Sequence, residues 1–135
     1  MMRAGLLIGL AMLGSVSTAH AANVQDQADC ARVAQKDFDE AKGSSAGKTL
    51  SSFESHYNTK MHACLVLLHF YYAEDYRTGH TLIDEIGNHI YADYMSSRGN
   101  TKIAWCFFEP APYAERKSCN SLDEFMAGIK PYMTE

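Results

Sequence analysis

A run of polar and aromatic side chains at residues 53–58 holds the residue types that most readily do chemistry. Ser55, His56, Tyr57 and Asn58 follow one another directly after the acidic Glu54. Serine, histidine and a carboxylate are the groups of a hydrolase triad, in which the imidazole acts as base for the hydroxyl. Ser55 and His56 are adjacent, however, and adjacent side chains of an extended segment point to opposite faces. We therefore expect hydrogen bonding and packing from this cluster, and keep a small hydrolase that uses His56 as an alternative.

Two further patterns resemble catalytic motifs but lack the context that those motifs need. Residues 43–47 match G-x-S-x-G, yet they follow a predicted helix instead of joining a strand to a helix. Gly47, Lys48 and Thr49 resemble the end of a phosphate-binding loop, but Lys42 stands where that motif requires its first glycine. The sequence therefore assigns no catalytic residue and no cofactor.

Five histidines lie beyond residue 21, and imidazole is a common metal ligand. His62 and His69 would face opposite sides of one strand, whereas His80 and His89 flank a predicted hairpin and could approach each other. Met61 beside His62 would suit copper, although methionine more often fills cores. A metal-binding periplasmic protein stays open as an alternative, without any assigned metal ligand.

Four cysteines predict a covalent scaffold of two disulfides. Cys30, Cys64, Cys106 and Cys119 allow three connectivities. We favour Cys30–Cys64, which would join the first helix to a strand, and Cys106–Cys119, which would bracket a proline-bearing loop. No C-x-x-C pair occurs, so the spacing argues against a zinc site and a redox-active dithiol.

The first 21 residues have the pattern of a bacterial export signal. Arg3 precedes an apolar stretch at residues 4–16, and Ala19-His20-Ala21 gives a small-x-small cleavage site. The apolar stretch is too short to span a membrane, which takes about 20 residues. We expect cleavage after Ala21, a single domain at residues 22–135, a periplasmic or secreted location, and no membrane insertion after cleavage.

The charge of the chain beyond residue 21 limits its partners. That part holds 11 Lys and Arg against 16 Asp and Glu, because residues 1–21 contain one Arg and no acid, so its net charge is −5. Nucleic acids and anionic membranes attract basic surfaces. The composition therefore argues against nucleic acid as a partner.

Periodicity and turn residues predict an α+β domain with an N-terminal helix, about four antiparallel strands and a C-terminal helix. The first helix would begin at an Asp26 N-cap, and a capping box at residues 121–124 would open the last one. Both helices could pack on one face of the sheet. The expected segments are a helix at 26–42, a linker at 43–52, strands at 61–72, 81–86, 89–97 and 102–108, with a hairpin turn at 87–88, and a helix from 121 to about 131.

Three segments of the chain together resemble those of small exported bacterial proteins of unassigned function. The first is Ser55-His56-Tyr57-Asn58 followed by Cys64, the second is the Tyr-rich region around residues 91–94, and the third is the C-terminal D-E-F…K-P-Y-M pattern at residues 123–133. The resemblance implies a single disulfide-linked domain and no known activity. We therefore predict a non-catalytic, exported interaction module that binds a protein or a cell-envelope component. The sequence leaves its oligomeric state open.

Overall fold

The computed structural model describes residues 18–42 and 48–134, which form an α+β fold with a six-stranded antiparallel sheet and two disulfides. The strands follow one another across the sheet in chain order, β1 to β6. The sheet thus has six strands where four were expected. In chain order the elements are α1 (Thr18–Lys42), β1 (Lys48–Asn58), β2 (Ala63–Tyr72), β3 (Arg77–Asp84), β4 (His89–Ser96), the 3-10 turn η1 (Arg98–Asn100), β5 (Ile103–Phe108), β6 (Lys117–Ser118) and α2 (Leu122–Thr134).

The largest departure from expectation is β1, because residues 48–52 were predicted to be linker and instead form the first half of this strand. Residues 43–47, the rest of that predicted linker, lie outside the described residues. β2 is apolar on both faces and needs a hydrogen-bonded neighbour at each edge. β1 supplies one, pairing antiparallel from Lys48 opposite Tyr72 to Asn58 opposite Ala63. Pairing with β2 therefore outweighs the weak strand propensity of the Ser-rich segment.

Three successive hairpins carry the chain from β1 to β4, each through a four-residue turn at residues 59–62, 73–76 and 85–88. The last residue of each turn is left-handed: His62 (φ 51°), Tyr76 (φ 57°) and Asn88 (φ 51°). The hairpin predicted around residues 87–88 is confirmed, with a longer turn. The hairpin at residues 73–76 was not expected, although it sets the register between β2 and β3.

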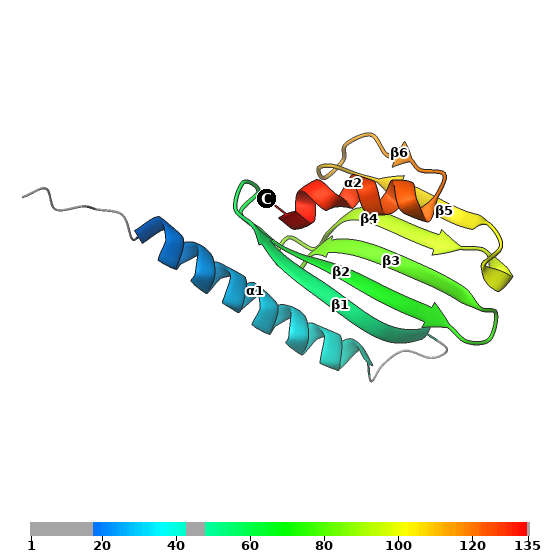
Figure 1. Ribbon diagram of the computed structural model, residues 1–135, viewed down its shortest axis with the longest axis horizontal. Coiled ribbons are helices and arrows are strands. Elements are labelled where there is room, and N and C mark those ends of the chain that lie inside the picture. Colours follow the sequence, from blue (N-terminus) through cyan, green and yellow to red (C-terminus); the bar gives the residue numbers. More distant parts are fainter. Residues whose placement is uncertain (1–17, 43–47, 135) are drawn as a thin grey trace, which may run out of the picture.

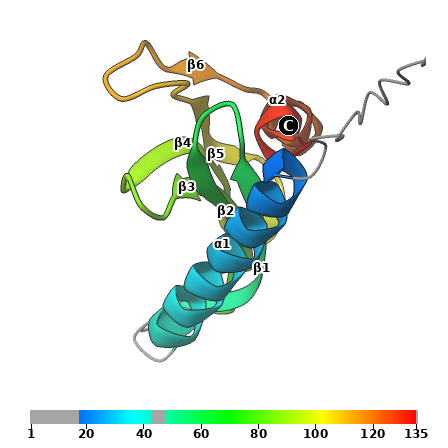
Figure 2. The ribbon, with the colours of Figure 1, turned by 90° about the vertical axis from the view of Figure 1, so that its left-hand side faces the viewer.

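The two helices lie on opposite faces of the sheet, so the expectation that both share one face is wrong. Alternation along β2 points Cys64 and Val66 toward α1, whereas Leu65 and Leu67 pack with α2. All four are buried, so each face needs its own cover. Figure 1 shows α1 running along β1 and α2 lying near β4 and β5. In Figure 2, β3 and β4 lie beside α1 and are not covered by it.

Both predicted disulfides are present. Cys30 of α1 is bonded to Cys64 of β2, with their Cα atoms 5.3 Å apart. Cys106 of β5 is bonded to Cys119, which follows β6, with a Cα separation of 5.1 Å. The first disulfide fastens α1 to the sheet, and the second closes the loop that contains Pro110.

The helices begin differently from each other. α1 already extends from Thr18, so Asp26 lies inside the helix and is not its N-cap. The predicted N-cap of α2 is confirmed, since the Ser121 Oγ accepts a hydrogen bond from the Glu124 backbone amide at 2.9 Å. The Glu124 carboxylate completes the cap one residue earlier than in a standard capping box, by accepting a hydrogen bond from the Asn120 backbone amide at 2.7 Å. Within the described part of the chain, neither helix has the length and apolar character needed to cross a membrane.

Candidate functional site

The structure divides the Ser55–Asn58 cluster between the two faces of β1. Ser55 and Tyr57 point to the face covered by α1, since Ser55 pairs with Val66 and Tyr57 packs in the same apolar cluster. His56 pairs with Leu65 and Asn58 bonds to α2, so both belong to the other face. Ser55 and His56 are therefore not brought together as a nucleophile and its base.

The side chain of Asn58 links two parts of the fold by hydrogen bonds. Its side chain is buried, at 2% exposure. Its Oδ1 accepts hydrogen bonds from the amides of Lys60 (3.1 Å) and Met61 (3.0 Å), and its Nδ2 donates to the carbonyl of Tyr132 (3.1 Å). The side chain thereby holds the first hairpin turn and the end of α2 together.

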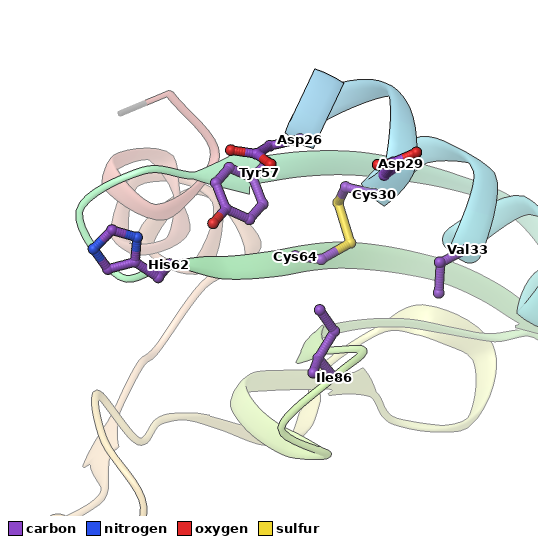
Figure 3. Close-up of a pocket in the computed structure, with 8 residues that line it drawn as sticks. All are labelled: Asp26, Asp29, Cys30, Val33, Tyr57, His62, Cys64 and Ile86. Carbon is purple, nitrogen blue, oxygen red and sulfur yellow. A yellow bond between two sulfur atoms is a disulfide. The ribbon is translucent and has the colours of Figure 1, made fainter. Parts of the chain in front are cut away.

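Tyr57 lies in a cavity of about 270 Å³ between α1, the first hairpin turn and the β3–β4 turn. Figure 3 shows the Cys30–Cys64 disulfide in its middle, Ile86 facing it across the gap, and the Tyr57 hydroxyl pointing toward the end where His62 lies. We call this cavity the α1 pocket. It is lined by Asp26, Asp29, Cys30, Val33, Tyr57, His62, Cys64 and Ile86.

The walls of the α1 pocket are held in place by polar and covalent links. Gln27 of α1 accepts a hydrogen bond from the Tyr57 amide (2.8 Å) and donates one to the Ser55 carbonyl (3.2 Å). These bonds join α1 to the outer edge of β1, whose backbone groups would otherwise be unpaired. Together with the Cys30 disulfide they fix the position of the helix, so the pocket is largely pre-formed.

Two acidic side chains of α1 line this pocket, and a further acidic pair lies beyond it. Asp26 and Asp29 line it from α1, and Asp29 also forms a 2.6 Å ion pair with the largely exposed Arg32. Two turns further along α1, Asp37 meets Glu85, the neighbour of Ile86. Burial, the hydrogen bond that protonated Glu85 donates to Asp37, and the charges of Asp37 and Asp84 raise the pKa of Glu85 from its ordinary 4.5 to about 7.

We call Asp26, Asp29, Asp37 and Glu85 the acidic margin. Crowding of carboxyl groups adds to the effect of burial on the pKa of Glu85. Of the eight described residues lining the pocket, two are acids and none is lysine or arginine. The margin is therefore a place where added positive charge would be stabilised.

A second constellation lies on the opposite face of the sheet, where Glu54, His69 and His80 form a chain across β1, β2 and β3. The two Nδ1 atoms of the histidines are 2.7 Å apart, and Nε2 of His69 lies 3.3 Å from Oε1 of Glu54. All contacts are satisfied when His69 carries its proton on Nε2 and His80 on Nδ1. Burial, and secondarily the charge of His69, lowers the pKa of His80 from 6.5 to about 4, which keeps this ring neutral at neutral pH.

Sequence reasoning weighed His69 with His62 and His80 with His89, and it missed the pair that forms. A hairpin centred between residues 74 and 75 would have aligned His69 with His80, but the turn residues there, Ala73-Glu74-Asp75-Tyr76, lack a glycine signal. Among the described residues, no group of three or more His, Cys, Asp or Glu side chains is arranged to hold a metal ion.

Comparison with known proteins gives no match: no protein-family model fits the chain, and no curated protein or solved structure matches it significantly. The functional conclusion therefore depends on the geometry of the site.

Proposed function

We propose that this protein is an exported, disulfide-linked interaction module whose α1 pocket binds a basic side chain, arginine or lysine, on a segment of a partner protein. The observation that carries this proposal is the combination of apolar walls and the carboxylates of Asp26 and Asp29 in one pre-formed cavity. Export is supported by the signal-like pattern of residues 1–21 and by the two disulfides, since disulfides persist in oxidising compartments such as the periplasm.

The size of the pocket favours a side chain over a large cofactor. Its volume of about 270 Å³ is just below the range of about 300–1,000 Å³ that is usual for small-molecule sites. Val33 and Ile86 contribute apolar surface that is still in water, with 37% and 76% of each residue exposed. The methylene stem of an arginine or lysine can cover such surface while its charged end stays near carboxylates.

The charge around the pocket favours a cation. A guanidinium or ammonium group would be attracted by the Asp26 carboxylate. Near Glu85 it would also offset the charges of Asp37 and Asp84, which together with burial raise the pKa of that carboxyl. The expected binding is weak to moderate, because the margin is partly exposed and salt screens such charges.

More apolar surface for a partner lies on the same face, on the part of the sheet that α1 leaves uncovered. Ile90 and Trp105 are 45% and 43% exposed there. Asp93 organises this region, because its carboxylate accepts hydrogen bonds from Trp105 Nε1 (2.6 Å) and Thr81 Oγ1 (2.7 Å). A peptide anchored in the pocket could therefore continue across β3, β4 and β5.

A direct test is a fluorescence anisotropy titration with labelled hexapeptides. The probes would be a Lys-Leu alternating peptide and its Glu-Leu counterpart of equal length. We expect binding of the first only, weakening as salt rises from 0.05 to 0.3 M. Equal binding of both peptides, or binding unaffected by salt, would argue that the acidic margin does not select the ligand.

Variants assign the binding to the pocket. Ile86→Ser should weaken binding about three- to tenfold through lost apolar contact, and Asp26→Asn about threefold through lost charge. Val24→Ser is the matched control, because Val24 is 64% exposed on the same helix and does not line the pocket. A Val24→Ser effect as large as that of Ile86→Ser would place the peptide elsewhere.

A further inference from the structure

Trp105 of β5 presents its indole ring on the same face of the sheet as the α1 pocket, and 43% of the residue is exposed. It stands opposite Met95 of β4, which packs with Phe38 of α1, so Trp105 belongs to that face. The indole is held in one orientation, because its Nε1 donates a 2.6 Å hydrogen bond to Asp93, which also accepts one of 2.7 Å from Thr81. We call Trp105 and Asp93 the tryptophan shelf.

We propose that the tryptophan shelf binds a second basic side chain, with arginine preferred, of the same partner segment whose first basic side chain occupies the α1 pocket. This inference rests on the proposed function of that pocket. The partner is therefore an extended segment that carries two basic residues at a fixed separation. The shelf is too exposed to hold a lone cation firmly, but it adds affinity once the segment is anchored in the pocket.

The chemistry of the shelf favours a guanidinium group. Tryptophan attracts a cation over its ring face more strongly than the other aromatic residues do. A carboxylate has about four acceptor positions, and Trp105 and Thr81 occupy two of those of Asp93. The other positions can accept hydrogen bonds from a guanidinium that lies on the ring. Arginine is preferred to lysine because its planar group stacks and donates hydrogen bonds at the same time.

The charge of Asp93 remains to attract such a cation, because both of the groups that donate to it are neutral. Two arginines lie near this face, and each already has an acidic partner. Arg116 forms a 2.6 Å ion pair with Glu109, and Arg77 forms one of 2.8 Å with Asp75. Neither arginine therefore takes the place of the basic side chain that the shelf would bind.

The register of the sheet sets the distance between the two sites. Ile90 lies at the beginning of β4, beside the turn that carries Ile86 of the α1 pocket. Met95 lies five residues further along β4, with one bulged position between them, and stands opposite Trp105. With about 3.4 Å per residue and about 4.8 Å between strands, Ile90 and Trp105 are about 15 Å apart. An extended segment from the pocket to the shelf therefore has its two basic residues about five positions apart.

The test is a fluorescence titration with three uncharged-end octapeptides of glycine and serine. One carries two arginines with four residues between them, one carries two adjacent arginines, and one carries a single arginine. Trp105 is the only tryptophan of the chain, so its emission reports directly on the shelf. We expect the spaced peptide to bind about three- to tenfold more tightly than the single-arginine peptide and to change the emission, whereas the adjacent pair gains at most about twofold. Equal affinity of the spaced and adjacent peptides, or unchanged emission with the spaced peptide bound, would overturn the shelf.

Variants, measured by anisotropy of labelled peptides, assign the gain. Trp105→Leu should abolish the gain of the spaced peptide and leave the affinity of the single-arginine peptide unchanged. Asp93→Asn should remove most of the gain, although its amide oxygen can still accept from the indole. Tyr113→Ser is the matched control, because Tyr113 is a fully exposed aromatic residue of the β5–β6 loop, and it should keep the gain. A full gain in folded Trp105→Leu would refute the shelf. Circular dichroism checks folding, and if Trp105→Leu fails to fold, Asp93→Asn decides.

The single-arginine peptide separates the two proposals. If it binds and Ile86→Ser weakens that binding, the α1 pocket stands, and a missing gain of the spaced peptide refutes the shelf alone. If the single-arginine peptide does not bind, the proposed function fails and the shelf fails with it.

Discussion

Replacing Glu85 by glutamine should stabilise the protein at alkaline pH and leave its stability at acidic pH unchanged. The pKa of Glu85 is raised from 4.5 to about 7, mainly by burial and then by its hydrogen bond to Asp37 and the charges of Asp37 and Asp84. A raised carboxyl pKa means that the folded state holds a proton that the unfolded state has lost. Stability therefore falls as the pH rises from about 4.5 to 7, and the penalty is full above pH 7.

The size of the effect follows from the shift. One pKa unit corresponds to about 1.4 kcal/mol, so a shift from 4.5 to about 7 sets an upper limit of about 3.4 kcal/mol. Glu85 is only partly buried, and solvent screening reduces the value to about 1–2 kcal/mol. Glu85→Gln removes the ionisable proton with little change of shape, so it should recover this amount at pH 8 and nothing at pH 4.

The assay is urea unfolding of wild type and Glu85→Gln at pH 4 and pH 8, followed by circular dichroism. A matching thermal scan at pH 8 should show a rise of about 4–8 °C. Glu115→Gln is the control, because Glu115 is an exposed glutamate of the β5–β6 loop and its replacement should change little. A gain of equal size at both pH values would refute the reasoning, as would the absence of any gain at pH 8.

Three further predictions concern stability and are measured by urea unfolding. Asn58→Ala should cost about 2–3 kcal/mol, because it leaves two amides of the first turn and a carbonyl of α2 without their partner; a loss below 0.5 kcal/mol would contradict this role. Gly79→Ala should cost about 1–3 kcal/mol, since its new Cβ would overlap the ring of Phe70. Adding Phe70→Leu to the Gly79→Ala variant should recover part of that loss. If the losses of unfolding free energy of the two single variants simply add in the double variant, the ring is not the obstacle. Replacing both cysteines of the Cys64 disulfide by alanine should cost about 4 kcal/mol and both of the Cys106 disulfide about 3 kcal/mol, since the linked residues are 34 and 13 positions apart; the reverse order would contradict the loop-length argument.

Several elements were predictable because their signals are local. The helix at residues 26–42, the Gly87-Asn88 turn and the Ser121 N-cap each depend on a few neighbouring residues. Of the three possible connectivities of the four cysteines, the structure contains the one favoured from the sequence.

The remaining features depend on pairing between distant segments, which local patterns do not encode. β1 forms because β2 needs a partner at its edge, despite the Ser-rich composition of residues 48–52. The helices take opposite faces because both faces of β2 are apolar, and that same observation could have predicted it. The His69–His80 pair depends on the register of a hairpin that has no glycine signal.

The α1 pocket was only partly foreseeable. Tyr57 belonged to the predicted functional cluster, but Asp26 was assigned to a helix cap. Ile86 lines the pocket because the turn between β3 and β4 has four residues instead of the two that were predicted. The pocket forms where a helix, a turn and a second hairpin meet. No single stretch of the sequence therefore carries its pattern.

The most direct test of cation binding in the α1 pocket is an NMR titration with n-butylguanidinium, the simplest group that joins an apolar stem to a planar cation. The largest shifts should be at the methyl groups of Val33 and Ile86, with smaller ones at the Tyr57 ring, and all should shrink in high salt. n-Butanol serves as the uncharged control and should leave these signals almost unmoved. Shifts spread evenly over the protein, or concentrated away from these residues, would contradict the proposed function.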